Sequence, residues 1–375
     1  MKDVTVFMKT VGMITFHSAC NYGAILQTTA LYHSLKHILN VSPVVVDYTP
    51  LSIKIADFVR FFPVSFNLRE VLTGLLTFDA RKRKINEFRT YSNEYMVKTV
   101  KFRSKRNLYK SYPNVDVHLC GSDQIWNPQL TLGVCAPLFL DYAAKSTSIK
   151  ASYSASFGLS NLPRFTNKRI AQLLSKLDKI SVREKSGQDI VNGLIGRHAE
   201  CTVDPTLLLS DKEWDNYITE PRISKPYILV FKMQNNSKIY ETARILKRLT
   251  DLPIIEVSRY GFKHYGIDVS FADVGPSEFL GFIKNAEYVC TNSYHGILFS
   301  LIYDRPCFFH SGSRWNERGQ HVMTLVEQKD KIITDQIVNA SNCMDYCVKI
   351  SEEARQRLEE EKQHSINYLH RVLEG

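Results

Sequence analysis

One strand–turn–helix junction, residues 286–299, constrains the fold of this chain most strongly. An apolar run of strand character, 288–290, is interrupted by Thr291-Asn292-Ser293, and a run of helical character follows His295-Gly296. In open α/β sheets, ligands bind where the carboxyl ends of strands meet the following helices. The N–H groups of such a helix end suit phosphate, and a histidine there can move protons near neutral pH. The junction predicts a phosphate-bearing ligand beside an acid or base, unless His295 is only a buried core histidine.

Apolar runs of strand length alternate with helical spacing along most of the chain. The expected strands are 11–16, 44–47, 115–120, 149–154, 179–182, 199–203, 227–232, 254–257, 288–290 and 307–310. The expected helices are 24–39, 237–250, 276–285, 297–302 and 351–373. Such β-α-β units build parallel sheets. We therefore expect an α/β protein with two halves around a cleft, joined near the polar stretch 210–225, with the last helix packing back across both.

The net charge of +10 restricts the expected partners. This excess favours phosphorylated substrates, nucleic acid or an anionic membrane face. Nucleic acid is the weakest of the three, because no zinc-finger spacing or RNA-recognition signature is present. The cysteines form no C-x-x-C pair, which argues against zinc and fits a reducing compartment. With no secretory signal and no apolar run of about 18 residues, we expect a cytoplasmic protein.

Residues 51–106 depart from the alternation. Large apolar side chains dominate 51–78, and two basic clusters follow at 81–84 and 101–106. Apolar surface flanked by basic residues can hold a protein on the inner face of an anionic membrane. The alternative, which we prefer from the residues alone, is two core helices with a solvated basic end.

Two further sites lie at the ends of expected strands. Gly121-Ser122-Asp123 follows the strand at 115–120, where glycine allows close approach of a ligand. Asp123 can accept or orient a hydroxyl proton, or else close a local turn. Arg183 also ends a strand, and its guanidinium can clamp a carboxylate or phosphate. The alternative for Arg183 is a structural ion pair with Glu184 or Asp204.

The polar loop 311–321 is the last candidate. Arg314, Arg318 and His321 give it a phosphate-binding character, and a solvated surface loop is the alternative. The chain has no Walker A pattern, no G-x-G-x-x-G fingerprint and no D-x-D motif. We expect no metal site.

In this order, the motifs resemble the polysaccharide pyruvyl transferase family. The matching segments are 14–17, 21–24 with Leu26-Gln27, 121–126, 152–158, 181–184, 204–209 and 291–296. The resemblance implies a GT-B-like fold of two Rossmann-like domains facing across a cleft that holds the active site. We divide the chain into residues 1–212, on the acceptor side, and 213–375, on the phosphoenolpyruvate side.

The resemblance also implies an activity. Pyruvate is transferred from phosphoenolpyruvate onto two hydroxyls of one sugar as a cyclic ketal, with no cofactor beyond that co-substrate. The acceptor would be a cell-surface or capsular polysaccharide precursor, and the 51–106 region favours a lipid-diphosphate-linked form. His295 matches the histidine of the family's active site, and Arg183 matches a basic residue that holds phosphoenolpyruvate. Some members carry arginine where this chain has Ser293, so another cation is needed.

These considerations give three sets of candidate residues. The catalytic candidates are His295 and Asp123. The phosphoenolpyruvate-binding candidates are Arg183, Asn292, Ser293, Gly296, Arg314, Arg318 and Lys232. The acceptor-binding candidates are His17, Asn21, Tyr22, Gly121 and Ser122. Two other classes stay open: a GT-B glycosyltransferase that uses a nucleotide sugar, and a non-catalytic binding module of a polysaccharide assembly complex.

Overall fold

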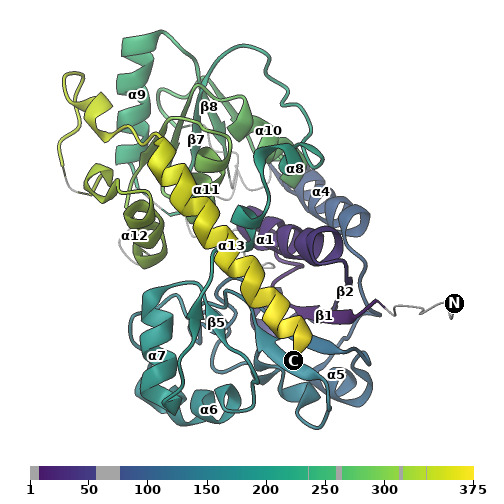
Figure 1. Cartoon of the computed structure of the whole chain (residues 1–375). Coiled ribbons are helices and arrows are strands. Elements are labelled where there is room, and N and C mark those ends of the chain that lie inside the picture. Colours follow the sequence, from purple (N-terminus) through teal and green to yellow (C-terminus); the bar gives the residue numbers. More distant parts are fainter. Residues whose placement is uncertain (1–7, 56–76, 235, 259–263, 312–315, 335) are drawn as a thin grey trace, which may run out of the picture.

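The computed structural model describes residues 8–55, 77–234, 236–258, 264–311, 316–334 and 336–375, and its two larger sheets lie one in each half of the molecule (Figure 1). The first sheet has the order β2-β1-β3-β4 and is parallel throughout. Its strands are β1 (Thr10–Ile14), β2 (Ser42–Val45), β3 (Val117–Cys120) and β4 (Ile149–Ser152). Two short parallel strands, β5 (Ser181–Val182) and β6 (Glu200–Cys201), continue it through isolated bridges to the segment after β4.

The second sheet is also parallel, with the order β11-β10-β7-β8-β9. Its strands are β7 (Ile228–Phe231), β8 (Ile254–Val257), β9 (Val269–Phe271), β10 (Tyr288–Thr291) and β11 (Cys307–Phe309). The central strand β7 reads Ile-Leu-Val-Phe and is buried at every position. Such continuous apolar runs are typical of parallel strands that helices cover on both faces.

Helices connect the strands in both halves. In the first half these are α1 (Tyr22–His33) with a π-helical turn at Ser34–Ile38, α4 (Phe78–Tyr95), α5 (Lys105–Ser111), α6 (Arg164–Leu174) and α7 (Lys185–Ile195). The later helices are α8 (Asp211–Asp215), α9 (Lys238–Thr250), α10 (Pro276–Lys284), α11 (Tyr294–Ile302), α12 (Asn316–Leu325) and α13 (Glu352–Glu374). The 3-10 turns are Ala136–Phe139, Asp141–Ala143, Pro205–Leu208, Lys329–Lys331 and Cys343–Tyr346.

The last helix, α13, runs across both halves, as Figure 1 shows in yellow. Near its start, Arg357 Nε donates a hydrogen bond of 3.2 Å to the carbonyl of Leu325, at the end of α12. Near its end, the Tyr368 hydroxyl donates a bond of 2.8 Å to the carbonyl of Ser152 on β4. The predicted packing of a terminal helix across both halves is confirmed.

A shared core joins the halves. The largest hydrophobic cluster contains buried residues of both sheets, such as Leu119 and Leu229. Tyr22, at the start of α1, stacks on Phe279 of α10 with ring centroids 4.2 Å apart. Its hydroxyl donates a hydrogen bond of 2.8 Å to the carbonyl of Val274. The contact between the halves is therefore largely apolar and tightly packed.

Most expected elements are present within a few residues of their predicted limits. The two parallel sheets give the GT-B-like arrangement of Rossmann-like halves expected from the motifs, while the division at residue 212 stays a prediction. A helix after Arg183, observed as α7, was expected, but the sequence interpretation lacked β9, α5, α6, α8 and α12, and most of the apolar 51–78 stretch lies outside the described residues. Within the described part, no helix is both long and apolar enough to span a membrane. All eight cysteines are free thiols.

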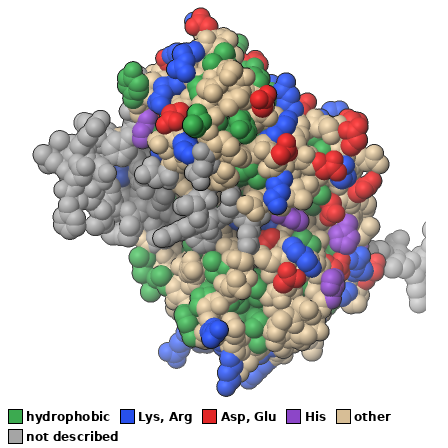
Figure 2. All heavy atoms as spheres, turned by 90° about the vertical axis from the view of Figure 1, so that its left-hand side faces the viewer, with side chains coloured by type: hydrophobic (Ala, Val, Ile, Leu, Met, Phe, Trp, Pro, Cys, Tyr) green, Lys and Arg blue, Asp and Glu red, His purple; other side chains and the backbone are tan. Residues whose placement is uncertain are grey.

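The basic residues 81–84 do not form one solvated end. Arg81 and Lys84 are buried on the inner face of α4, with 5% and 8% of their surface exposed, whereas Lys82 and Arg83 are exposed. On the face shown in Figure 2, basic and acidic side chains are interspersed. The excess positive charge is therefore not gathered into one patch on that face.

Because His118 on β3 is buried, we expect the protein to lose stability in acid. Its ring lies edge-on to the rings of Tyr112 and Tyr142, and neither of its nitrogens has a hydrogen-bond partner among the described residues. Burial, together with nearby Lys150, lowers the pKa of His118 to about 4. Between that value and the unfolded pKa of about 6.5, the unfolded chain binds more protons, so stability falls as the pH drops through this window.

We expect His118→Phe to flatten this decline by on the order of 1–3 kcal/mol between pH 7 and pH 4. Urea unfolding at several pH values measures the effect. The exposed His198, changed to Phe, is the matched control and should leave the slope as in the wild type. Equal slopes for His118→Phe and the wild type would contradict the assignment.

Candidate active site

A buried ion pair between Arg183 and Asp204 lies where the first half meets the second. Arg183 follows β5, and Asp204 begins the 3-10 turn Pro205–Leu208 by accepting a hydrogen bond of 2.9 Å from the N–H of Thr206. Arg183 Nη1 is 3.0 Å from Asp204 Oδ2, and the two residues are 2% and 1% exposed. Burial alone would raise the pKa of Asp204, but the charges of Arg183 and His295 hold it well below its usual value. Asp204 is therefore a buried carboxylate that is ionised at neutral pH.

His295 reaches the same carboxylate from the second half. It lies in the first turn of α11, which Ser293 caps, and its Nε2 is 3.5 Å from Asp204 Oδ2. Gly23 of α1 packs against the other side of the ring, where a Cβ would lie 2.0 Å from His295 Nδ1. The imidazole is therefore held between Asp204 and the backbone of α1.

A second acid and a second arginine complete the cluster. Arg318 of α12 places Nη1 3.5 Å from Asp123 Oδ1, and Arg183 Nη1 is 3.9 Å from the same oxygen. The Tyr294 ring lies beside both guanidiniums, its centroid 5.4 Å from Cζ of Arg183 and 5.0 Å from Cζ of Arg318. Burial, and then the charge of Arg183, lower the pKa of Arg318.

Several buried polar atoms of this cluster lack a hydrogen-bond partner among the described residues. They are Arg183 Nε, Glu184 Oε2 and Arg318 Nε; Arg183 Nη1, Asp204 Oδ2 and His295 Nε2 also form no hydrogen bond, although they lie in ion pairs with one another. Buried polar groups in proteins are nearly always hydrogen-bonded, so a concentration of unpaired ones needs an explanation. The cationic nitrogens can bind an anion, and the imidazole beside them can transfer a proton. In the described part of the chain, no group of three or more His, Cys, Asp or Glu is arranged to hold a metal ion.

The structure brings His295, Asp123, Arg183, Arg318 and Ser122 together. Ser122 joins the cluster because its Oγ accepts a hydrogen bond from Arg183 Nη2. Gly121, before it, packs on the backbone of Tyr153, where a Cβ would lie 2.1 Å from the carbonyl oxygen.

Three candidates of the 291–296 junction make local contacts. Asn292 Oδ1 accepts a bond of 2.8 Å from the N–H of Met233, and its Nδ2 donates one of 3.0 Å to the carbonyl of Gln234. Ser293 Oγ accepts a bond of 3.3 Å from the N–H of Gly296. Gly296 packs on Thr291, whose Oγ1 lies 2.5 Å from the place of a Cβ. These residues shape the junction, and their predicted contact with phosphoenolpyruvate stays a prediction.

The remaining candidates within the described residues do not contact the cluster of charged residues. Lys232 lies over the ring of Tyr240, with Nζ 4.8 Å from the centroid, and Arg314 is outside the described residues. His17 Nε2 is 3.1 Å from Asp47 Oδ1. Asn21 caps α1 by accepting a bond of 3.3 Å from the N–H of Ala24. The Tyr22 side chain packs on Phe279 in the contact between the halves and does not reach the cluster.

Sequence reasoning missed Tyr294 and Gly23, and considered Asp204 only as a structural partner of Arg183. The glycine requirement at position 23 arises from a ring more than 270 residues away, so no local pattern indicates it. The usable signal for Asp204 was its place at the start of the 204–209 motif, where a proline follows an acid.

Gly23→Ala should destabilise the protein by about 1–3 kcal/mol, because the added methyl would overlap the His295 ring. The matched control is Gly193→Ala in α7, where a Cβ meets no atom within 4 Å and alanine favours the helix. Thermal unfolding of both variants measures the difference. A Gly23→Ala variant as stable as the control would contradict the tight packing of α1 on His295.

Fold and site together define an α/β protein in which charged side chains from two Rossmann-like halves converge in one buried cluster. The sequence model of the polysaccharide pyruvyl transferase family matches residues 21–312, so this chain belongs to that family, whose members transfer pyruvyl groups to polysaccharides. No curated protein matches the chain.

Several solved structures are similar over almost the whole chain. A UDP-N-acetylglucosamine 2-epimerase from Rickettsia bellii is 10% identical with a TM-score of 0.48, covering 98% of this chain and 97% of that one. The UDP-GlcNAc 2-epimerase of Methanocaldococcus jannaschii is 15% identical with a TM-score of 0.47, covering 96% and 93%. An alpha-glucosyltransferase in complex with UDP is 8% identical with a TM-score of 0.47, covering 97% and 95%.

Proposed function

We propose that the protein transfers pyruvate from phosphoenolpyruvate onto two hydroxyls of a sugar in a polysaccharide precursor, forming a cyclic ketal. The observation that carries this proposal is the buried cluster of charged side chains around Arg183, His295 and Arg318, in which several nitrogens, such as Arg183 Nε and Arg318 Nε, lack a hydrogen-bond partner among the described residues. Phosphoenolpyruvate has a carboxylate and a phosphate on adjacent positions. Arg183 and Arg318, both beside the Tyr294 ring, supply a separate cation for each of these groups.

In the first step, a proton goes to the methylene carbon and C2 acquires oxocarbenium character. A sugar hydroxyl attacks C2 and loses its proton to His295 or Asp123. The C2–O bond to phosphate then breaks, and a neighbouring hydroxyl closes the ketal as it loses its own proton. Arg183 and Arg318 would stabilise the departing phosphate, and preorganised charges of this kind usually make the largest contribution to catalysis.

Asp204 gives His295 its role in this scheme. The buried carboxylate 3.5 Å from Nε2 orients the imidazole, which would donate the proton to the methylene carbon. Once the proton has been transferred, the neutral ring can accept one from a hydroxyl. The acceptor sugar would enter from the side of His17, Asn21 and Ser122.

Ligand-dependent thermal unfolding tests the donor. A ligand that binds only the folded state raises the melting temperature. We expect phosphoenolpyruvate to stabilise the wild type, and Arg318→Gln to reduce that shift while leaving the unliganded protein folded. UDP-GlcNAc is the comparison ligand. Stabilisation by UDP-GlcNAc alone would replace pyruvyl transfer with nucleotide-sugar chemistry. If phosphoenolpyruvate stabilises the protein, release of phosphate in the presence of candidate sugars identifies the acceptor.

A further inference from the structure

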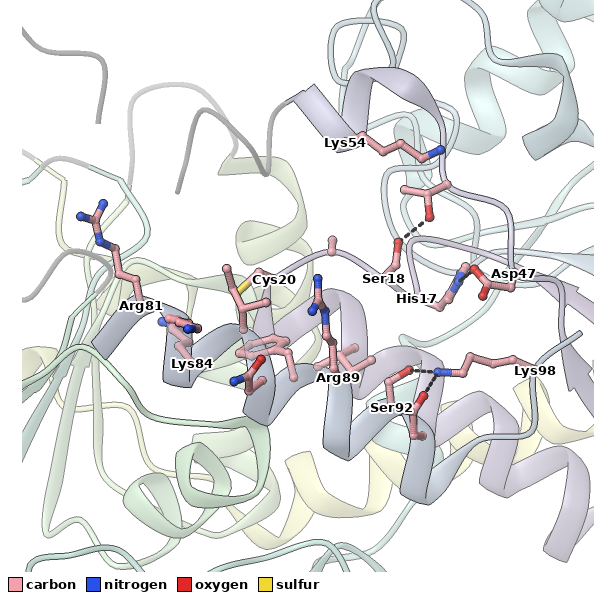
Figure 3. Close-up of a pocket in the computed structure, with 18 of the residues that line it drawn as sticks. His17, Ser18, Cys20, Asp47, Lys54, Arg81, Lys84, Arg89, Ser92 and Lys98 are labelled. Carbon is pink, nitrogen blue, oxygen red and sulfur yellow. Dashed lines mark hydrogen bonds and ion pairs between the residues drawn. The ribbon is translucent and has the colours of Figure 1, made fainter. Parts of the chain in front are cut away.

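Apart from the candidate active site, a cavity of about 850 Å³ lies beside α4, and most of its charged lining residues are positive (Figure 3). We call it the basic pocket. Among the described residues, its charged lining consists of one carboxylate, Asp47, and the cations Lys54, Arg81, Lys82, Lys84, Arg89, Lys98 and Lys101. On the face shown in Figure 2, by contrast, basic and acidic side chains are mixed. We propose that the basic pocket binds the diphosphate group of the acceptor substrate.

Electrostatics supports an anionic occupant. Asp47 is already engaged, since His17 Nε2 lies 3.1 Å from its Oδ1, and that contact offsets the effect of burial and lowers the pKa of Asp47. Lys82, Arg89 and Lys101 form no ion pair with a carboxylate in the described ranges of the chain. Like charges that share a cavity repel one another, and a bound polyanion would relieve that repulsion.

The arrangement of the cations favours an extended anion over a single phosphate. Arg81, Lys84 and Arg89 project from one helix, α4, as Figure 3 shows. Eight residues separate the first from the last, which is a rise of about 12 Å along a helix. Lys54 and Lys98 approach from other segments of the chain. A diphosphate can contact more of these groups at once than phosphate can.

The segment that lines the basic pocket leads along the chain to a residue that contacts the candidate active site. His17, Ser18, Ala19 and Cys20 line the pocket, and the chain continues from them directly into α1. Gly23, in the first turn of α1, contacts His295. A sugar attached to a diphosphate in the basic pocket would therefore extend along the 17–23 segment toward His295. The identity of the ligand as the acceptor rests on the proposed function; diphosphate binding does not.

Apolar groups line the basic pocket as well. Phe78, Ile85 and Phe88 belong to α4, and Ile25 to α1. A diphosphate could thus be carried by a prenyl chain or by a nucleoside. The shared chemistry is the diphosphate, and separate probes distinguish its two sources.

The test measures binding of inorganic pyrophosphate to the full chain by calorimetry. The pocket variant combines Lys82→Gln, Arg89→Gln and Lys101→Gln, all at exposed positions. The control variant, Lys145→Gln, Lys168→Gln and Arg248→Gln, removes the same charge from exposed positions outside the pocket. We expect pyrophosphate to bind the wild type more tightly than phosphate. The pocket variant should bind it at least about 10-fold more weakly, and the control within about 2-fold of the wild type. Equal losses in both variants, or none in the pocket variant, would overturn the site.

Further ligands separate this proposal from the proposed function. Geranyl diphosphate and UDP, used as competitors, show whether a prenyl or a nucleoside diphosphate is preferred. If neither displaces pyrophosphate, the diphosphate assignment fails. Displacement of pyrophosphate by phosphoenolpyruvate would make the basic pocket a donor site and overturn the acceptor assignment. If pyrophosphate binds as expected and phosphoenolpyruvate binds nowhere, the diphosphate site stands and pyruvyl transfer fails.

Discussion

Replacing Arg183 by methionine is expected to destabilise the protein by about 3–5 kcal/mol, the range for removing one partner of a buried ion pair. Asp204 would remain buried and charged, with the imidazole of the buried His295 3.5 Å from its Oδ2. Because the folded-state pKa of Asp204 is depressed, the contribution of the pair is present above the ordinary carboxyl pKa and is lost as the pH falls below it. Urea unfolding at pH 7 and at pH 3 measures both effects.

A double variant separates stability from binding. Adding Asp204→Asn to Arg183→Met removes the stranded charge but keeps an oxygen to accept from Thr206. We expect the double variant to recover at least half of the lost stability, yet not to bind phosphoenolpyruvate. The exposed pair Lys185–Asp189 is the control, and Lys185→Met should cost under about 0.5 kcal/mol. A double variant as unstable as Arg183→Met would show that the ion pair is not the cause.

His295→Gln should lower turnover by about 100- to 10,000-fold, the usual contribution of a positioned acid or base. Glutamine keeps a polar group near Asp204 but cannot transfer a proton. The variant should still bind phosphoenolpyruvate, because the arginines remain. Phosphate release with the acceptor found in the sugar screen measures turnover, and the pH dependence of kcat should lose one limb.

His198→Gln is the matched control for this change, since His198 is exposed on the first half, and its turnover should equal that of the wild type. Turnover of His295→Gln within about 3-fold of the wild type would remove His295 from proton transfer. Asp123, 3.5 Å from Arg318, would then be the remaining candidate.

The sequence predicted the fold better than the site. Strands such as 228–231 are continuous apolar runs, and the amphipathic terminal helix has its own periodicity, so both are readable locally. Strand β9, Val269–Phe271, is three residues long and only partly buried, and its pairing with β8 rather than its composition makes it a strand. Such short edge strands leave little pattern to detect.

For the site, the sequence identified residues at strand ends but not their partners. Asp123 and Arg183 follow strands β3 and β5 of the first half and His295 follows β10 of the second, and they meet because the carboxyl ends of both sets of parallel strands face the junction between the halves. Asn292 also follows β10, yet its amide holds the backbone at Met233 and Gln234, almost 60 residues earlier. The basic residues of α4 suggested a solvated end, whereas two of them are buried in a cavity wall. Only the three-dimensional fold determines which polar groups are already paired.

The path of α13 limits how the molecule can open. The helix is bonded to Leu325 at one end and to Ser152 at the other, and between them its Ser365 Oγ accepts a hydrogen bond of 3.0 Å from the N–H of Val203, beside Asp204. The helix and the chain crossing near Asp204 therefore run side by side and are fastened to each other. A motion that separates the halves must bend α13 or break one of these bonds, so substrate exchange should proceed by small rotations about this double connection, and shortening the helix should allow a wider opening.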